Sequence, residues 1–157
     1  MKISLIVVAK TLSLYLQEGE NEYINRLKHY SDFEYLVIPA LKNTKALNEQ
    51  QQKIEEGKLI LNKVVPSDFC VLLDENGSTF GSEKFAEFLQ NKALSGIKRL
   101  VFIVGGPYGF SEDVYQRADY KLSLSKMTFS HQMVRLIFLE QLYRAFTILK
   151  NEPYHHK

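Results

Sequence analysis

The end of the chain carries the residues best suited to moving a proton. Residues 152–157 (EPYHHK) set Tyr154 beside His155 and His156, and a neutral imidazole exchanges protons near neutral pH. Two histidines are too few to hold a metal, and no further Cys, His or Asp cluster lies nearby in the sequence. We therefore expect no metal site. A free chain end is normally disordered, so these side chains need an anchored preceding segment to deliver them.

A glycine-rich stretch follows an apolar run in residues 101–110 (VFIVGGPYGF). Its spacing fits neither the phosphate-binding P-loop, which needs a Lys and a hydroxyl after the last glycine, nor the dinucleotide fingerprint G-x-G-x-x-G. Glycine tolerates positive φ and lets a ligand approach the main chain, while proline stiffens a turn. The stretch is therefore either a site of close backbone approach or a tight structural turn.

Two further loops and one helix carry polar side chains. Residues 73–77 (LDENG) end an apolar run, but the Asn-Gly pair favours a solvated turn over an acid/base site. Residues 122–129 (LSLSKMTF) read by composition as a polar loop. On the helix that follows, i, i+4 spacing pairs His131 with Arg135 and Glu140 with Arg144. For both pairs a structural role is favoured, with a ligand contact as the alternative for His131 near the helix N-terminus.

Apolar runs alternate with helical stretches along the chain. Runs at residues 3–9, 33–39, 69–73 and 99–104 predict strands, and three of these four are continuous, as in parallel strands covered on both faces. Residues 121–124 predict a weaker fifth strand. Helices are predicted at residues 13–30, 47–64, 82–93 and 130–150. This alternation predicts an α/β fold with βαβ crossovers. The last helix is apolar around most of its axis, which suggests a subunit interface.

Composition narrows the class of protein. A length of 157 residues with 45% apolar content predicts one domain spanning residues 1–157. Residues 115–157 contain seven Lys or Arg and three Asp or Glu, a bias compatible with an anionic partner or with an ordinary basic surface. The lone Cys70 excludes a disulfide within the chain, and no run approaches membrane-spanning length. No cleavage site follows the first apolar run, so we expect a cytoplasmic protein.

Read together, several stretches resemble one family. Residues 73–89, 101–110, 122–146 and 152–155 closely resemble the ribosomal RNA large subunit methyltransferase H family, the 23S rRNA (pseudouridine-1915-N3) methyltransferases. The resemblance covers the full chain, and its specificity comes from the ordered set of motifs. It implies a SPOUT fold, an α/β parallel-rich sheet flanked by helices with a C-terminal trefoil knot. It also implies a homodimer whose partner is the ribosome.

The same resemblance implies S-adenosylmethionine as cofactor, bound by loops at three strand ends. The residues carried over are Leu73, Gly105, Leu124, Ser125, Lys126, Met127, Thr128 and Phe129. N3 of pseudouridine carries a hydrogen, so methylation needs a base or an environment that favours the anion, and we expect His155 with Tyr154 to serve this step. We expect Arg135 and Arg144 to position RNA or the subunit interface.

The sequence departs from the family pattern at two places. Ser130 stands where the family usually has Pro, and His156 leaves open which histidine aligns with the family's tail.

Two other classes of protein remain. One is a catalytically silent RNA-binding or ribosome-associated module; the sequence contains no RNA-stacking motifs that would support it. The other is a flavodoxin-like protein, which predicts a phosphate loop after the first strand, where residues 9–13 contain no glycine.

Overall fold

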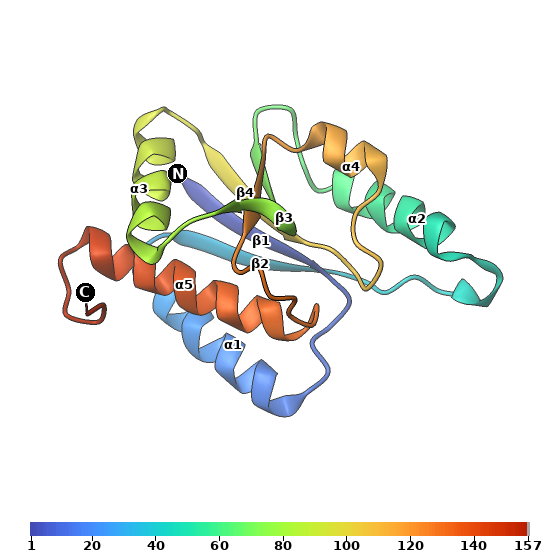
Figure 1. Cartoon of the computed structure of the whole chain (residues 1–157), viewed down its shortest axis with the longest axis horizontal. Helices are drawn as coiled ribbons and strands as arrows, with labels where there is room; N and C mark the ends of the chain where they lie inside the picture. The colour runs from blue at the N-terminus through green and yellow to red at the C-terminus, as the bar shows by residue number, and fades with distance from the viewer. Residues whose placement is uncertain (157) are drawn as a thin grey trace.

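A parallel sheet forms the centre of the computed structural model, which describes residues 1–156 (Figure 1). The five strands lie in the order β2-β1-β4-β3-β5, and every neighbouring pair runs parallel. The predicted α/β class with a parallel sheet is confirmed. The strands are β1 (Lys2–Val8), β2 (Asp32–Ile38), β3 (Phe69–Thr79), β4 (Arg99–Val104) and β5 (Tyr120–Ser123).

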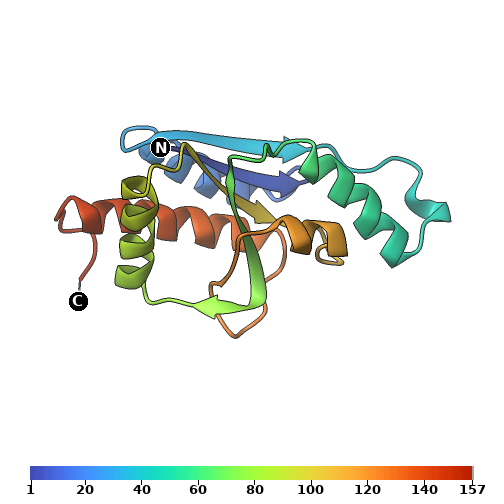
Figure 2. The ribbon, with the colours of Figure 1, turned by 90° about the horizontal axis from the view of Figure 1, so that it is seen from above.

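Helices cover both faces of this sheet (Figures 1 and 2). On one face α5 lies between α1 and α3, and on the other α2 contacts α4. The α-helices are α1 (Leu14–Leu27), α2 (Glu49–Leu61), α3 (Ser82–Leu94), α4 (Glu112–Arg117) and α5 (Met133–Leu149), with a short 3₁₀ turn η1 at Thr44–Ala46.

The continuous apolar runs are explained by this two-sided cover. Along β1, Ile3, Leu5 and Val7 belong to the core under α1, α3 and α5. The alternate residues Ile6 and Val8 belong to the core under α2 and α4. Side chains of a strand alternate between faces, so a strand buried on both faces is apolar at most positions. The buried polar residue of β1, Ser4, is hydrogen-bonded to Glu34 and Arg99.

The apolar circumference of α5 is largely explained within one chain. Phe138, Leu139, Leu142 and Ala145 are buried against the sheet, α1 and α3. Phe138 meets Phe102 of β4 at a centroid distance of 4.7 Å. Packing within one chain therefore covers these apolar residues of the helix. The apolar pattern of α5 alone is thus weak evidence for a subunit interface.

An irregularity joins β3 to the edge strand β5. Leu122 of β5 pairs with Leu73 and again with Ser78, so residues 74–77 leave the ladder between the two pairings. Gly77 lies at this point, where a Cβ atom would fall 2.6 Å from the main-chain carbonyl carbon and oxygen of Lys121. A glycine is therefore required for β3 and β5 to pass this closely.

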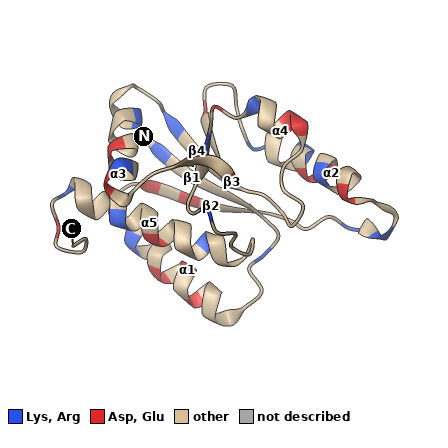
Figure 3. Cartoon of the chain, in the orientation of Figure 1, with Lys and Arg blue, Asp and Glu red and all other residues tan. Residues whose placement is uncertain are grey.

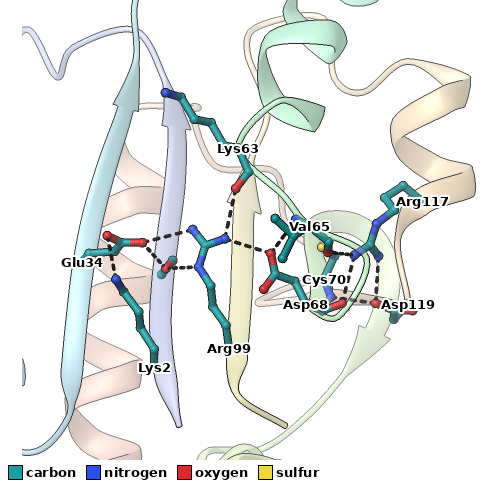
Figure 4. Close-up of polar contacts among 10 residues, drawn as sticks. Lys2, Glu34, Lys63, Val65, Asp68, Cys70, Arg99, Arg117 and Asp119 are labelled. Carbon is teal, nitrogen blue, oxygen red and sulfur yellow. Dashed lines mark hydrogen bonds and ion pairs between the residues drawn. The ribbon is translucent and has the colours of Figure 1, made fainter.

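A polar network ties the strands together at their N-terminal ends (Figure 4). Arg99 of β4 donates to Glu34 of β2 at 3.1 Å, to Ser4 of β1 at 3.0 Å and to Asp68 at 2.9 Å. Burial raises the pKa of Glu34, but hydrogen bonds from Ser4, Arg99 and Lys2 outweigh it, and the net shift is downward from 4.5. The network is at the edge opposite to the cavity described below, and we assign it to stability.

Candidate active site

A cavity of about 530 Å³ lies beyond the C-terminal ends of β4 and β5 and beyond residues 69–73, the part of β3 that pairs regularly with its neighbours. Its size falls within the range typical of small-molecule sites. Ligands of open α/β sheets gather at this edge, because the loops that leave parallel strands meet there. The wall consists of residues 73–76, 104–110, 115, 122–125, 127–131 and 134.

The sheet order brings most of the predicted cofactor residues into this wall. Leu73 ends the regular part of β3, and Gly105 follows β4, which is the neighbour of β3. From the loop after β5 come Leu124, Ser125, Met127, Thr128 and Phe129. Lys126 is the exception, since it is exposed and is absent from the cavity wall.

The glycine loop forms one side of the cavity. Gly109 has φ +84° and donates its N–H to the carbonyl of Gly106 at 3.1 Å, which closes a tight turn. Gly105 and Gly106 are buried, while Pro107, Tyr108 and Gly109 are exposed at the rim. The two alternatives left open by the sequence are therefore both realised, because the loop is a tight turn and its backbone also faces the cavity.

The 73–77 segment departs from the expected solvated turn. Asp74 is partly buried in the cavity wall, where it accepts a hydrogen bond from Tyr115 Oη at 2.6 Å and from the N–H of Asn76 at 2.9 Å. Burial, together with the bond to Asp74, raises the pKa of Tyr115 to about 12. Tyr115 therefore keeps its proton and fixes Asp74 in place. The strand-end position was the sequence signal for this residue.

Hydrogen bonds also fix the loop after β5. Thr128 Oγ1 donates to Glu75 Oε2 at 2.5 Å, which joins this loop to the end of β3. Within the loop, Ser123 Oγ donates to the carbonyl of Ser125 at 2.7 Å, and the N–H of Met127 donates to Ser125 Oγ at 3.0 Å. The hydroxyls of this segment thus shape the cavity wall from within the protein.

His131, just before α5, also lines the cavity. Burial and the charge of Arg135 lower its pKa, so the imidazole is neutral at neutral pH. Neutral imidazole has one nitrogen that accepts a proton and one that donates. The sequence favoured a structural role for His131 over a ligand contact, whereas its place in the cavity wall supports the ligand contact.

The charged side chains of the wall are acidic, since His131, Tyr108 and Tyr115 are neutral at neutral pH. Asp74 and Glu75 lie in it, while neither Lys nor Arg belongs to it within residues 1–156. Phosphate sites normally supply cationic side chains or a helix N-terminus. The charge of this cavity therefore favours a ligand without phosphates that carries positive charge.

Arg135 has a different environment from the one that RNA binding requires. Its side chain is fully buried, and its guanidinium donates to the carbonyls of Val8 at 2.6 Å and Ala9 at 2.8 Å, to Thr11 Oγ1 at 3.1 Å and to the carbonyl of His131 at 3.1 Å. These bonds tie the end of β1 to the start of α5. A buried guanidinium offers RNA no surface, so we assign Arg135 a structural role in place of the expected substrate contact.

The C-terminal tail folds onto the far part of α5. Tyr154 Oη donates to Glu140 Oε1 at 3.0 Å, and Arg144 donates to the same oxygen at 2.7 Å. Nδ1 of His155 lies 3.1 Å from Arg144 Nη1. Burial, then hydrogen bonds with Tyr23 and Glu140, raise the pKa of Tyr154 well above its usual value. The structure therefore brings together Arg144, Tyr154 and His155, with Tyr154 held as a neutral hydrogen-bond donor.

This tail cluster, comprising Glu140, Arg144, Tyr154 and His155, is separated from the cavity in the same chain. Val134 of α5 lines the cavity, and Arg144 of the cluster lies ten residues further along the helix. At 1.5 Å per residue this is about 15 Å along the axis. The cavity and the tail cluster thus form two separate groups within one chain.

Charge does not single out one face for RNA. Figure 3 shows both signs on α1, α2, α3 and α5. Within the described part of the chain, no helix is long and apolar enough to cross a membrane. No group of three or more His, Cys, Asp or Glu side chains is arranged to hold a metal ion among residues 1–156.

Comparison with known proteins gives the family. Residues 1–155 match the family model described as "Predicted SPOUT methyltransferase". The chain is 62% identical to the ribosomal RNA large subunit methyltransferase H of Christiangramia forsetii and 61% identical to that of Parabacteroides distasonis. Identity to the protein of the same name from Flavobacterium psychrophilum is 58%, and all three alignments cover 100% of both chains.

The α/β sheet with a cavity at its strand ends is thus the scaffold of a SPOUT methyltransferase. The chain belongs to the SPOUT methyltransferase family and, within it, to the ribosomal RNA large subunit methyltransferase H group.

Proposed function

We propose that this protein transfers a methyl group from S-adenosylmethionine to large-subunit ribosomal RNA, at N3 of pseudouridine 1915 of 23S rRNA in assembled ribosomes. The observation that carries the proposal is the cavity at the ends of β4, β3 and β5, with glycine backbone on one side and acidic side chains in its wall. The names of the relatives support the RNA substrate.

The residues of the cavity fit this cofactor. S-adenosylmethionine has no phosphate and carries a sulfonium and an ammonium group, which suits a wall with Asp74 and Glu75 and with neither Lys nor Arg in residues 1–156. Adenine needs an apolar slot and main-chain hydrogen-bonding groups, which Leu73, Phe129 and the glycine loop supply. When bound, the cofactor provides an activated methyl group, and the protein provides orientation and control of charge.

N3 of the target must lose its proton before it can attack. We propose His155, from the tail, as the residue whose imidazole accepts this proton, with Arg144 and Tyr154 orienting it. Because the tail cluster of one chain is about 15 Å along α5 from the cavity, we propose a homodimer in which the tail of one copy serves the cavity of the other. His131, neutral in the cavity wall, is the alternative acceptor.

A C-terminal trefoil knot and a cytoplasmic location belong to the same proposal. The segment after β5 contacts the end of β3 through Thr128 and Glu75 and then leads to α5 on the opposite face from α4. This crossing at the doubled β3–β5 pairing is where we propose that the chain passes through a loop. The proposed substrate, the ribosome, supports the cytoplasmic location.

The test is transfer of labelled methyl from S-adenosylmethionine to ribosomes that lack the modification, followed by mapping of the modified base. We expect label at one pseudouridine of the large subunit. Label only on free RNA, or on another nucleotide, contradicts the substrate assignment. Absence of cofactor binding at millimolar concentration contradicts the enzyme itself and favours a silent RNA-binding module.

Two neighbouring histidines provide a matched pair of variants for the base. We expect His155→Ala to reduce turnover about 10²-fold or more while the cofactor Kd stays unchanged. His156→Ala, at the exposed next position, is the control and is expected to retain turnover. If His155→Ala retains turnover and His131→Ala loses it, the proton acceptor is His131.

A further inference from the structure

A buried carboxyl group lies behind the glycine loop, outside the cavity wall. Glu56 of α2 is 4% exposed, and one of its oxygens, Oε2, accepts a weak hydrogen bond from Gln52 Nε2 at 3.3 Å. Its other oxygen, Oε1, has no hydrogen-bond partner within residues 1–156. Leaving a buried acceptor unsatisfied costs free energy, so a residue held in this way calls for a role beyond packing.

The carboxyl group of Glu56 is seated directly against Gly106. A Cβ atom added to Gly106 would fall 2.6 Å from Oε1, 3.0 Å from Oε2 and 3.1 Å from the carboxyl carbon. Gly106 lines the cavity and Glu56 does not. One residue of backbone therefore separates the buried acid from the cavity.

The next residue of α2 makes a second close approach to the same segment. A Cβ atom on Gly57 would fall 2.4 Å from Ser111 Oγ, and Ser111 is the N-cap of α4. The helix α2 is thus fitted to both ends of the segment from Gly106 to Ser111. Of these two contacts, only that of Glu56 reaches a residue of the cavity wall.

We propose that Glu56 is a positioning residue for the cofactor: its carboxyl group, seated on Gly106, sets the place of the glycine loop at the cavity. The inference rests on the proposed cofactor site. Since the loop contributes backbone to the cavity, a displacement of Gly106 changes the fit of any ligand there. Glu56 acts through Gly106 and touches no ligand itself.

The test separates the length of the side chain from its charge. Glu56→Gln keeps the shape of the side chain, whereas Glu56→Asp keeps the acid and withdraws it from Gly106 by one methylene. We expect Glu56→Asp to weaken the Kd for S-adenosylmethionine and for S-adenosylhomocysteine about tenfold, and Glu56→Gln to stay within about threefold of wild type. Both constants are measured by titration calorimetry without RNA.

A double-mutant cycle tests the contact itself. Gly106→Ala is expected to weaken both ligands about tenfold because its Cβ occupies the place of the carboxyl group. Combining it with Glu56→Ala removes this clash, so the double variant should bind more tightly than the product of the single effects predicts. Thermal unfolding without ligand shows which variants are folded.

Glu20 of α1 supplies the matched control. It is also a buried glutamate, 3% exposed, with one oxygen lacking a partner within residues 1–156, but it accepts from Tyr35 and is outside the cavity wall. We expect Glu20→Asp to lower the melting temperature without changing either Kd.

Four results would overturn the inference: a wild-type Kd in Glu56→Asp, a loss confined to Glu56→Gln, multiplicative effects in the cycle, or an equal loss of affinity in Glu20→Asp. Failure of the wild-type protein to bind either ligand would instead refute the proposed function.

Discussion

Replacement of Arg135 tests how α5 is attached to the sheet. In Arg135→Met an unbranched apolar side chain replaces the guanidinium and donates no hydrogen bonds, so the carbonyls of buried Val8 and partly buried Ala9 lose their charged donor. Each unsatisfied buried acceptor costs about 1–3 kcal/mol. Counting these two carbonyls alone gives a loss of roughly 2–6 kcal/mol in the free energy of unfolding.

Urea unfolding of the purified variant measures this loss, and thermal unfolding gives an independent check. A central loss of about 4 kcal/mol lowers the melting temperature of a chain of this size by roughly 8–16 °C. Arg144→Met is the control, because Arg144 is 25% exposed and pairs with Glu140 one turn away on the same helix. Such a pair contributes about 1 kcal/mol or less.

The outcome distinguishes two roles for Arg135. A loss of stability that is larger than in Arg144→Met agrees with the structural role. If Arg135→Met is as stable as wild type and fails only to bind ribosomes, the reasoning from burial is refuted and the residue contacts RNA.

Three further predictions concern the strands. The pKa of Glu34 is lower in the folded protein than in the unfolded chain, so the stability that Glu34 contributes is complete above its unfolded pKa and is lost as pH falls through its folded pKa. Thermal stability should therefore drop more steeply below about pH 4.5 in wild type than in Glu34→Gln; equal slopes would contradict this. Tyr115→Phe removes the donor to Asp74 and should weaken cofactor binding about threefold to tenfold in calorimetry, whereas Tyr15→Phe, at a 64% exposed position, should not. Equal affinities for the two would mean that Asp74 needs no anchor. Gly77→Ala should destabilise the protein by about 1–3 kcal/mol in urea unfolding because its Cβ meets the main chain of β5; unchanged stability would show that the strands separate freely.

The sequence was sufficient to predict the strands that are buried on both faces. Continuous apolar runs placed β1 and β4 within a residue of their observed bounds. The edge strand β2, whose run is interrupted by Glu34, was placed equally well. The sequence missed the extension of β3 to Thr79, because residues 74–79 are polar and largely exposed and break the apolar pattern. It also missed α4, whose six residues are too few to show a helical period.

The order of the strands in the sheet determines which loops form the cavity. The periodicity of the sequence carries no information about that order. The resemblance to a known family suggested that Leu73, Gly105 and the loop after β5 form one pocket, and the pairing of β3 with both β4 and β5 is what brings them together. The roles of Arg135 and Glu56 depend on burial and on contacts far along the chain. No local pattern indicates such contacts.

The tail shows a different limit of sequence reasoning. Composition identified Tyr154 and His155 as candidates for proton transfer, but their partners Glu140 and Arg144 are set by the return of the chain onto α5. The same fold explains much of the apolar circumference of α5 within one chain.

The most direct measurement is a crystal structure of the protein with S-adenosylhomocysteine. The account predicts that the ligand lies in the cavity at the ends of β4, β3 and β5, in contact with Leu73, Gly105 and Phe129. A ligand bound outside this cavity, or at the tail cluster of its own chain, would contradict it.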